Sequence, residues 1–183
     1  MMRKRLTRDF FDRPTIKIVK ELLGKFLVRK TGRKIIAAMI TEIEAYVGLH
    51  DLASHASRGR TPRTEVMFGP PGLAYVYLIY GMYHCFNIVT ERNDYPAAVL
   101  IRSIDVAGIN GPGKVCRYFK INKLLNNENL VNSKKLWLED REVKIKPEQI
   151  KRAPRVGVDY AGAYKHKLWR FFIKKIDFHN LFR

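Results

Sequence analysis

The chain contains little cysteine. Only Cys85 and Cys116 occur among 183 residues, and no C-x-x-C pair is present. This absence argues against a zinc ribbon and against a zinc deaminase that binds its metal through such a pair. An iron–sulfur cluster needs four protein ligands of this kind and is excluded. We expect both cysteines to be small buried side chains in a reducing compartment.

The sequence also lacks a long apolar run. No stretch reaches the 18 apolar residues that indicate a membrane-spanning helix. The basic start, MMRKRLTRDFF, is not followed by the apolar segment of a signal peptide. We therefore expect a soluble, cytoplasmic protein that makes no contact with membranes.

Acidic residues are scarce relative to basic ones. The chain has 17 Asp and Glu against 35 Lys and Arg, which gives a formal net charge of +18. A surplus of this size favours polyanionic partners. Nucleic acid is the leading candidate, because neutralising its phosphates releases counterions and drives association. A ribosome-associated protein and a merely basic soluble protein stay open as alternatives.

The length and the 46% share of apolar residues suit one domain, residues 1–183, with a full-sized core. Strand patterns joined by hairpins outnumber helical patterns, so we predict an α+β fold on a mostly antiparallel sheet. The Asn-rich segment 126–135 is predicted to be a surface insertion of little consequence. Helices are predicted at residues 14–23 and after Pro112, and strands at 25–30, 34–46, 73–90 (a hairpin), 96–105, 141–146 and 169–175.

Two carboxylates stand at the end of the apolar strand predicted at residues 34–46. Strand side chains alternate, so Ile40, Glu42, Glu44 and Tyr46 are predicted to share one face. A carboxylate is costly to bury without a partner. Each acid therefore lies at a solvated edge, pairs with an arginine, or acts as a general base in a cleft. Arg102, late in another predicted strand, is a suitable partner that would keep the acid ionised.

Asp51 and His55 follow this strand and open a metal-site alternative. Carboxylates and imidazole bind divalent metals, but no defined spacing relates these two residues to Glu42 and Glu44. These residues are therefore weak evidence for a metal site, and the resemblance described below implies that the protein uses no metal and no cofactor.

The segment GINGPGKV, residues 108–115, has the glycine and lysine spacing of a phosphate-binding loop. That loop needs Ser or Thr after the lysine to hold magnesium, and Val115 stands there instead. We therefore prefer a helix N-terminus that contacts a nucleic-acid phosphate over an NTPase.

Tyrosine is concentrated in the predicted hairpin. Tyr75 and Tyr77 share one face of a strand, while Tyr80 and Tyr83 lie near the turn at Gly81. Such residues are ordinarily half-buried, with the hydroxyl in water. In a basic protein, a projecting aromatic hairpin is also a means of wedging into a base stack, where one base–aromatic contact contributes about 1–3 kcal/mol. The spacing alone leaves both interpretations open.

Several long motifs agree in order with one family over residues 5–178. They are EIEAYVG, SHASRGRTPRTEVMFGPPGLAYVYLIYGMYHCFNIV, AAVLIR, GPGKVCR and RVGVDYAG…WRFFI. Together they resemble the alkyladenine (3-methyladenine, or methylpurine) DNA glycosylase family. The resemblance implies a single mixed domain with a β-hairpin that enters the minor groove. It also implies a monofunctional enzyme that hydrolyses the N-glycosidic bond of alkylated or deaminated purines, after taking the damaged nucleotide out of the stack.

The resemblance assigns the chemistry to Glu44 and Arg102. Glu44 matches the carboxylate that deprotonates a water attacking the sugar C1′ and favours the positively charged sugar of the transition state. Arg102 matches the arginine that holds this water. A backbone carbonyl near Val156 is implied to complete the water site, and Glu42 is expected to be structural or to contact a neighbouring arginine.

Tyr46, His55 and Tyr77 match residues that line the base pocket. Their rings suit the positive charge of a 3-methyl- or 7-methylpurine. A cationic base is already a good leaving group, so one general base suffices where glycosidases use two carboxyls. Neutral hypoxanthine needs protonation, and no general acid is apparent for it. Asn87 matches the position that excludes guanine by crowding its 2-amino group.

Tyr80 matches the residue that fills the gap left by the everted nucleotide, and Met82 and Tyr83 match its neighbours against the opposite strand. The implied partner is double-stranded DNA with damaged purines, bound by a monomer in base excision repair.

Two other classes of protein stay open on the residues alone. One is a non-catalytic nucleic-acid-binding protein on the same scaffold, and the other is a metal-dependent nuclease that uses Glu42, Glu44 and Asp51.

Overall fold

The computed structural model describes residues 3–174, which form strands, short α-helices and single turns of 3-10 helix. The strands are β1 (Lys4–Arg5), β2 (Phe26–Thr31), β3 (Lys34–Val47), β4 (Ala74–Ile79), β5 (Tyr83–Val89), β6 (Ala97–Ile104), β7 (Leu136–Asp140), β8 (Ile150–Ala153) and β9 (Arg170–Ile173). The α-helices are α1 (Arg8–Phe11), α2 (Thr15–Leu22) and α3 (Pro112–Phe119). The 3-10 helices are η1 (His55–Arg58), η2 (Glu65–Phe68), η3 (Lys123–Leu125), η4 (Pro147–Gln149) and η5 (Gly162–His166).

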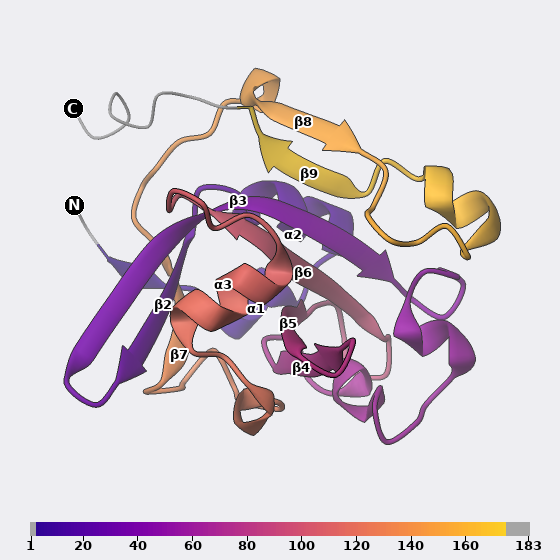
Figure 1. Cartoon of the computed structure of the whole chain (residues 1–183), viewed down its shortest axis with the longest axis horizontal. Coiled ribbons are helices and arrows are strands. Elements are labelled where there is room, and N and C mark those ends of the chain that lie inside the picture. Colours follow the sequence, from indigo (N-terminus) through magenta and orange to yellow (C-terminus); the bar gives the residue numbers. More distant parts are fainter. Residues whose placement is uncertain (1–2, 175–183) are drawn as a thin grey trace.

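The long strand β3 is the centre of the sheet (Figure 1). Its first half pairs with β2, and its second half pairs with both β6 and β9. The sheet continues from β2 to β7 and β1, and from β6 through β5 to β4, while β8 pairs with β9. Every pairing among the described strands is antiparallel, which confirms the predicted α+β fold.

The main core joins the sheet to two helices. α2 contributes Ile18 and Leu22, and α3 contributes Val115 and Phe119, all of them fully buried. Residues three or four apart lie on one face of a helix, so each helix presents an apolar stripe to the strands. Burial of one such aliphatic or aromatic side chain contributes about 1.5–3 kcal/mol. α2 packs on β3 and β6, and α3 packs on β5 and β6, so the strands that carry the site are held firmly.

Strands β4 and β5 form the predicted hairpin, which turns at Tyr80 and Gly81. The N–H of Met82 donates to the carbonyl of Ile79 at 3.2 Å, and Tyr80 and Gly81 have φ angles of 52° and 69°. Glycine adopts this conformation freely, whereas a bulky side chain seldom does. Tyr80 is 84% exposed, so burial does not offset its unfavourable backbone conformation. Stability alone therefore does not explain a tyrosine at this turn.

The alternation predicted along β3 is interrupted. The register between β3 and β6 shifts between Ile40 and Glu42 and again between Glu42 and Ile43. An irregularity of this kind breaks the strict alternation of faces. Ile40 is buried in the main core before this irregularity, and its predicted place on the face of the acids stays a prediction. Glu42, Glu44 and Tyr46 do share a face, since Arg102 contacts both acids and the Tyr46 hydroxyl contacts Glu44.

The strand predicted at residues 141–146 is wrong, and β7 lies just before it. Glu142 has a φ of 63°, which interrupts the extended chain. Val143 is buried, and Ile145 packs so closely on Gly24 that a β-carbon there would lie 2.7 Å from Cγ1 of Ile145. The alternating apolar residues are therefore satisfied by packing against a glycine and not by strand pairing.

The Asn-rich segment 126–135 is not a surface insertion of little consequence, because it covers the outer edge of β4. The side-chain oxygen of Asn126 accepts a hydrogen bond from the N–H of Val76 at 2.8 Å. Leu130 is buried in the main core. An uncovered edge strand invites pairing with other chains, so this segment protects the hairpin strand from such contacts.

All described strands belong to one continuous sheet. The predicted domain of residues 1–183 also includes residues 1–2 and 175–183, which lie outside the described part of the chain. Within residues 3–174, the helices are all too short or too polar to cross a membrane.

Candidate active site

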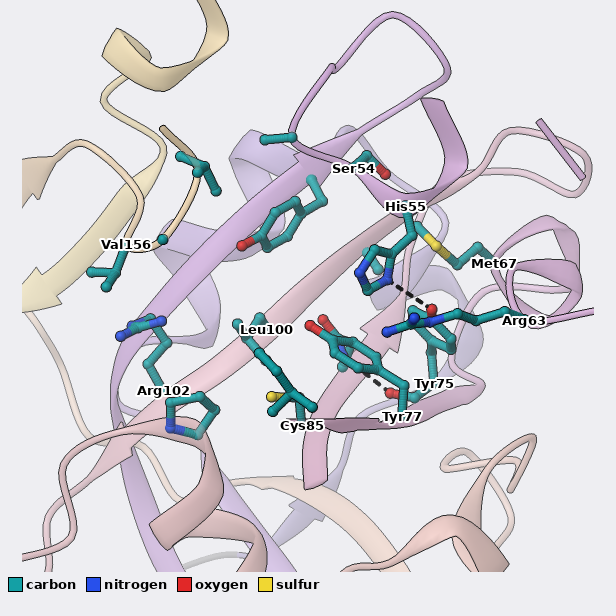
Figure 2. Close-up of a pocket in the computed structure, with 18 of the residues that line it drawn as sticks. Ser54, His55, Arg63, Met67, Tyr75, Tyr77, Cys85, Leu100, Arg102 and Val156 are labelled. Carbon is teal, nitrogen blue, oxygen red and sulfur yellow. Dashed lines mark hydrogen bonds between the residues drawn. The ribbon is translucent and has the colours of Figure 1, made fainter. Parts of the chain in front are cut away.

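A cavity of about 180 Å³ lies between the end of β3, the β4–β5 hairpin and the loop that follows β8. In Figure 2, Arg102 and Val156 lie on one side of this cavity, and His55 and Tyr77 lie on the other. The structure thus brings together pocket and catalytic candidates that are far apart in the sequence. The predicted residues that line the cavity are Tyr46, His55, Tyr77, Asn87, Arg102 and Val156.

The carboxylate of Glu44 lies just behind the cavity wall and is 0% exposed. Its Oε1 accepts a hydrogen bond from the backbone N–H of Val156 at 2.8 Å. Its Oε2 accepts from the hydroxyl of Tyr46 at 2.9 Å and from Nη1 of Arg102 at 3.3 Å. All three donor residues line the cavity. The observed contact at Val156 is made by its N–H, and the predicted role of a carbonyl there stays a prediction.

Burial raises the pKa of Glu44 above the usual value of a carboxyl group. The charge of Arg102, the N–H of Val156 and the hydroxyl of Tyr46 oppose this increase in pKa, while the charge of Glu42 adds to it. A carboxylate with a raised pKa is a stronger base than an exposed one, which suits proton transfer from water.

Arg102 is shared between two carboxylates. Its Nε lies 3.3 Å from Oε1 of Glu42, and its Nη1 lies 3.3 Å from Oε2 of Glu44. Glu42 also accepts hydrogen bonds from Nη1 of Arg170 at 3.0 Å and from the hydroxyl of Ser103 at 3.1 Å. The predicted contact between Glu42 and a neighbouring arginine is confirmed. Glu42 fixes the guanidinium that in turn faces Glu44.

Three rings form one wall of the cavity. The ring of His55 meets Tyr77 edge-on with centroids 4.6 Å apart, and the rings of Tyr75 and Tyr77 are 5.2 Å apart. Nδ1 of His55 lies 2.9 Å from the hydroxyl of Tyr75 (Figure 2). Burial, with the charges of Arg63 and Arg58, lowers the pKa of His55 to about 4. His55 is therefore neutral at pH 7 and brings no positive charge to the wall.

Arg63 is a cavity residue that the sequence-based prediction missed. Its guanidinium carbon lies 5.0 Å from the centroid of the Tyr77 ring, and its side chain points toward the aromatic wall (Figure 2). The residue is exposed, so water and salt partly screen its charge. A cation at this place disfavours a second positive charge in the cavity.

Asn87 lies on β5 and is 3% exposed, at the cavity lining. Its Nδ2 donates a hydrogen bond to the carbonyl of Tyr75 at 3.1 Å, which fixes the orientation of the amide. A fixed amide can exclude a base by shape, and the predicted clash with the 2-amino group of guanine stays a prediction.

Tyr80, Met82 and Tyr83 stand at the hairpin tip, where they are 84%, 67% and 40% exposed. The first turn of α3 supports the tip, since a β-carbon on Gly113 would lie 3.1 Å from the ring of Tyr83. Large apolar residues exposed together mark a contact surface. Their predicted contacts with DNA, and a phosphate contact at the N-terminus of α3, stay predictions.

The metal-site alternative is wrong for Asp51. Both of its carboxylate oxygens are bound by Arg155, with N–O distances of 2.6 Å and 2.8 Å, and both side chains are 0% exposed. Nδ1 of His55 is already hydrogen-bonded to the hydroxyl of Tyr75. Between residues 3 and 174, no three His, Cys, Asp or Glu side chains are grouped so that they could hold a metal ion.

An enzyme that acts on one base of a duplex has to take the base out of the stack, hold it and bring a reactive group to it. The hairpin tip, the aromatic cavity and the carboxylate behind the cavity wall are suited to these three tasks. These three features are the ones expected of a DNA-modifying enzyme of the base-flipping class.

Comparison with known proteins narrows this class. The sequence profile of the family described as Methylpurine-DNA glycosylase (MPG) matches residues 9–177. The chain belongs to this family, and it is a DNA glycosylase, a hydrolase of N-glycosyl bonds.

Individual relatives agree with this assignment. A protein of Methanocella arvoryzae is 46% identical over 187 residues, covering 92% of each chain. A protein of Clostridium perfringens is 41% identical over 200 residues, covering 95% of this chain and 98% of its own. One of Myxococcus xanthus is 44% identical over 177 residues, covering 92% of this chain and 90% of its own. All three carry the provisional name 3-methyladenine DNA glycosylase.

Proposed function

We propose that this chain excises 3-methyladenine and 7-methylguanine from duplex DNA and leaves an abasic site, with Glu44 as the general base. One observation carries the proposal: a buried carboxylate is held by three donors that all line the aromatic cavity. The cavity receives the everted purine, and its sugar lies against Arg102 and Val156. One chain supplies every one of these residues, which supports action as a monomer. We propose that this monomer acts on chromosomal DNA in the cytoplasm.

Among the described residues, the hydrogen bonds of Glu44 leave one acceptor position of the carboxylate unused. A carboxylate offers about four acceptor positions, two on each oxygen. Arg102 and Tyr46 fill both positions on Oε2, and the N–H of Val156 fills one on Oε1. The remaining position on Oε1, beside Val156, is the place for the attacking water.

The reaction follows from this placement. Glu44 takes one proton from the water as its oxygen forms a bond to C1′. The C1′–N bond breaks, and its electron pair leaves with the base. The negative charge of Glu44 stabilises the positive charge that develops on the sugar. Arg102 keeps Glu44 ionised before the reaction, and the proton that Glu44 has taken passes to solvent afterwards.

The leaving group decides which bases react. A purine methylated at N3 or N7 carries a positive charge, so it departs as a neutral molecule without a proton donor. No described residue of the cavity is an obvious acid at pH 7, because the pKa of His55 is about 4 and burial raises the pKa values of Tyr46 and Tyr77. Hypoxanthine would depart as an anion and is proposed to react far more slowly. Normal purines are disfavoured further, since removing one from the stack costs a few kcal/mol.

Free-base release tests the proposed function. The protein is incubated with methylated duplex DNA with and without EDTA, the supernatant is analysed by chromatography, and the strands are checked for breaks. We expect free 3-methyladenine and 7-methylguanine with unbroken strands, and much less base from a duplex that contains hypoxanthine. Cut strands whose formation EDTA abolishes would instead indicate a metal-dependent nuclease. Tight DNA binding with no released base would indicate a non-catalytic scaffold.

Tyr80→Ala tests the role of the hairpin tip. The variant loses the side chain proposed to fill the gap in the duplex, and one stacking contact contributes about 1–3 kcal/mol. We expect its affinity for a duplex with an abasic-site analogue to fall about 5- to 150-fold, which is that energy converted to a ratio. Excision from single-stranded methylated DNA should change little, because no gap needs filling there. Unchanged affinity for the duplex would refute the wedge assignment.

A further inference from the structure

A second ion pair lies behind the cavity and takes no part in the mechanism described so far. Arg155 binds both oxygens of Asp51 with its two Nη atoms, at 2.6 Å and 2.8 Å. Both side chains are 0% exposed, and neither lines the cavity. A two-pronged contact of this kind fixes direction as well as distance.

Both partners of this ion pair are also hydrogen-bonded to the end of β3, and Arg155 itself lies in the loop after β8. Asp51 accepts hydrogen bonds from the backbone N–H groups of Val47, at the end of β3, and of Ala53. Arg155 donates to the carbonyl of Ala45 on β3 at 2.8 Å. The pair therefore joins the end of β3 to the loop that follows β8.

The guanidinium of Arg155 also lies between two rings. Its central carbon is 4.8 Å from the ring centroid of Tyr46 and 5.1 Å from that of Trp169. Tyr46 lines the cavity and donates its hydroxyl to Glu44. Arg155 thus packs against a ring whose other contacts belong to the active site.

Stability is a poor explanation for such a pair. Removing two charges from water is costly, and buried ion pairs can often be replaced by apolar residues without loss of stability. The position of the pair in the chain points to another role. The residue after Arg155 is Val156, whose N–H donates to Oε1 of Glu44 at 2.8 Å.

We propose that Asp51 and Arg155 are positioning residues for base excision, which clamp the loop after β8 to β3 and so hold the N–H of Val156 on Glu44. This inference rests on the proposed role of Glu44 as the base. The clamp leaves a single acceptor position on Oε1 and thereby fixes where the attacking water binds. Without it, the loop moves away from β3, and the water is no longer aimed at C1′.

The clamp also acts on the protonation of Glu44. The N–H of Val156 opposes the increase in the pKa of Glu44 that burial causes. Loss of this hydrogen bond therefore raises the pKa of Glu44 further. The base form is lost as pH falls through that pKa, so the acid limb of the pH–rate profile moves to higher pH. The other charged or titratable groups that act on Glu44 are Arg102, Tyr46, Glu42 and Cys85, with Arg170 bound to Glu42.

The test compares two matched double variants. Asp51→Asn with Arg155→Met removes both charges of the clamp and keeps one acceptor oxygen, which serves the N–H of either Val47 or Ala53. Lys25→Met with Asp140→Asn removes both charges of a more exposed ion pair, at 2.7 Å, between the residue before β2 and the last residue of β7. Neither of these residues lines the cavity. Single-turnover excision of 3-methyladenine is measured across pH, together with affinity for an abasic-analogue duplex and the thermal midpoint.

We expect the clamp variant to excise about 10- to 100-fold more slowly, the loss that a small misplacement of a reacting group causes. Its affinity for DNA should stay within about twofold of the parent, and its acid limb should move to higher pH. Arg155→Lys keeps the charge but not the two-pronged contact, so it should recover little of the rate. The control should keep the rate and the pH profile of the parent. Parental rate and pH profile in the clamp variant would overturn the inference.

An NMR titration, which does not depend on catalytic activity, tests this inference independently of the proposed function. In the parent protein, the ¹⁵N and ¹H shifts of the Val156 amide should titrate with Glu44. In the single variants Asp51→Asn and Arg155→Lys, this response should be lost or reduced. An unchanged response in both would refute the clamp, even if the double variant did not fold. If Glu44→Gln excised normally while the Val156 response was lost as expected, the role of Glu44 as base would fail and the clamp would stand.

Discussion

Glu44→Gln is expected to slow the excision of 3-methyladenine about 10²- to 10⁴-fold, the usual contribution of a general base. The amide keeps the size of the side chain and still accepts from the N–H of Val156, but it cannot take a proton from water. Affinity for a duplex with an abasic-site analogue should stay close to that of the parent. Single-turnover kinetics and a binding titration measure the two quantities separately.

The matched control is Glu42→Gln, the same change two residues earlier on the same face of β3. Glu42 contacts Arg102, Arg170 and Ser103 and is not placed to hold the water. Its substitution should slow excision far less than that of Glu44, through a looser Arg102. If Glu44→Gln released 3-methyladenine at a near-parental rate, or if the two variants lost the same share of the rate, the role of Glu44 as general base would be contradicted.

Binding to DNA is expected to weaken steeply with salt. With six to ten phosphate contacts, affinity falls about 10³- to 10⁵-fold between 50 and 200 mM salt, because bound counterions are released on association. The surplus charge of +18 makes such a number of contacts available. The slope of log affinity against log salt measures how many cations take part.

Particular basic side chains are expected to account for this dependence of DNA affinity on salt. Arg117 and Lys120 are exposed and line a groove with Met82 and Tyr83, beside the hairpin tip. Replacing both by Ala should reduce the salt slope by about 1 per cation. Arg33 and Lys34 are exposed where β3 begins, about 33–36 Å along the strand from Glu44 at 3.3 Å per residue. Replacing these two should leave the slope unchanged, and equal effects of the two pairs would contradict a binding face at the hairpin.

The sequence predicted the parts of the fold that depend on local pattern. Long apolar alternation with a glycine at the turn is enough to define the β4–β5 hairpin, and helical spacing is enough for α2 and α3. The meeting of Glu44 with Arg102 was expected because both stand late in apolar strands and match one family. Strand pairing then placed Glu44 on β3 opposite Leu100, two residues before Arg102 on β6.

Features that depend on tertiary contact could not be predicted in this way. Asp51 and Arg155 are 104 positions apart, and nothing local marks them as partners. Asp51 therefore suggested a metal ligand, although its charge is neutralised by an arginine. The neutral state of His55 likewise depends on burial and on nearby arginines, and Arg63 gave no local signal of its place at the cavity.

The burial of apolar residues was misjudged where it did not involve regular strands. Val143 and Ile145 alternate like a strand but pack in irregular chain against Gly24. Leu130 is buried within a segment whose polar composition indicated only surface. Periodicity reports which side chains are buried, but it does not report whether the backbone beside them is paired.

A crystal structure of the protein bound to a duplex with one abasic-site analogue tests the central claim most directly. The quantity to measure is the position of the everted sugar relative to the side chain at position 44. We expect one ordered solvent molecule within about 3.2 Å of Oε1, between that oxygen and the anomeric carbon. A sugar lodged elsewhere on the surface, or an acid turned inward with no solvent between it and the sugar, would contradict the mechanism.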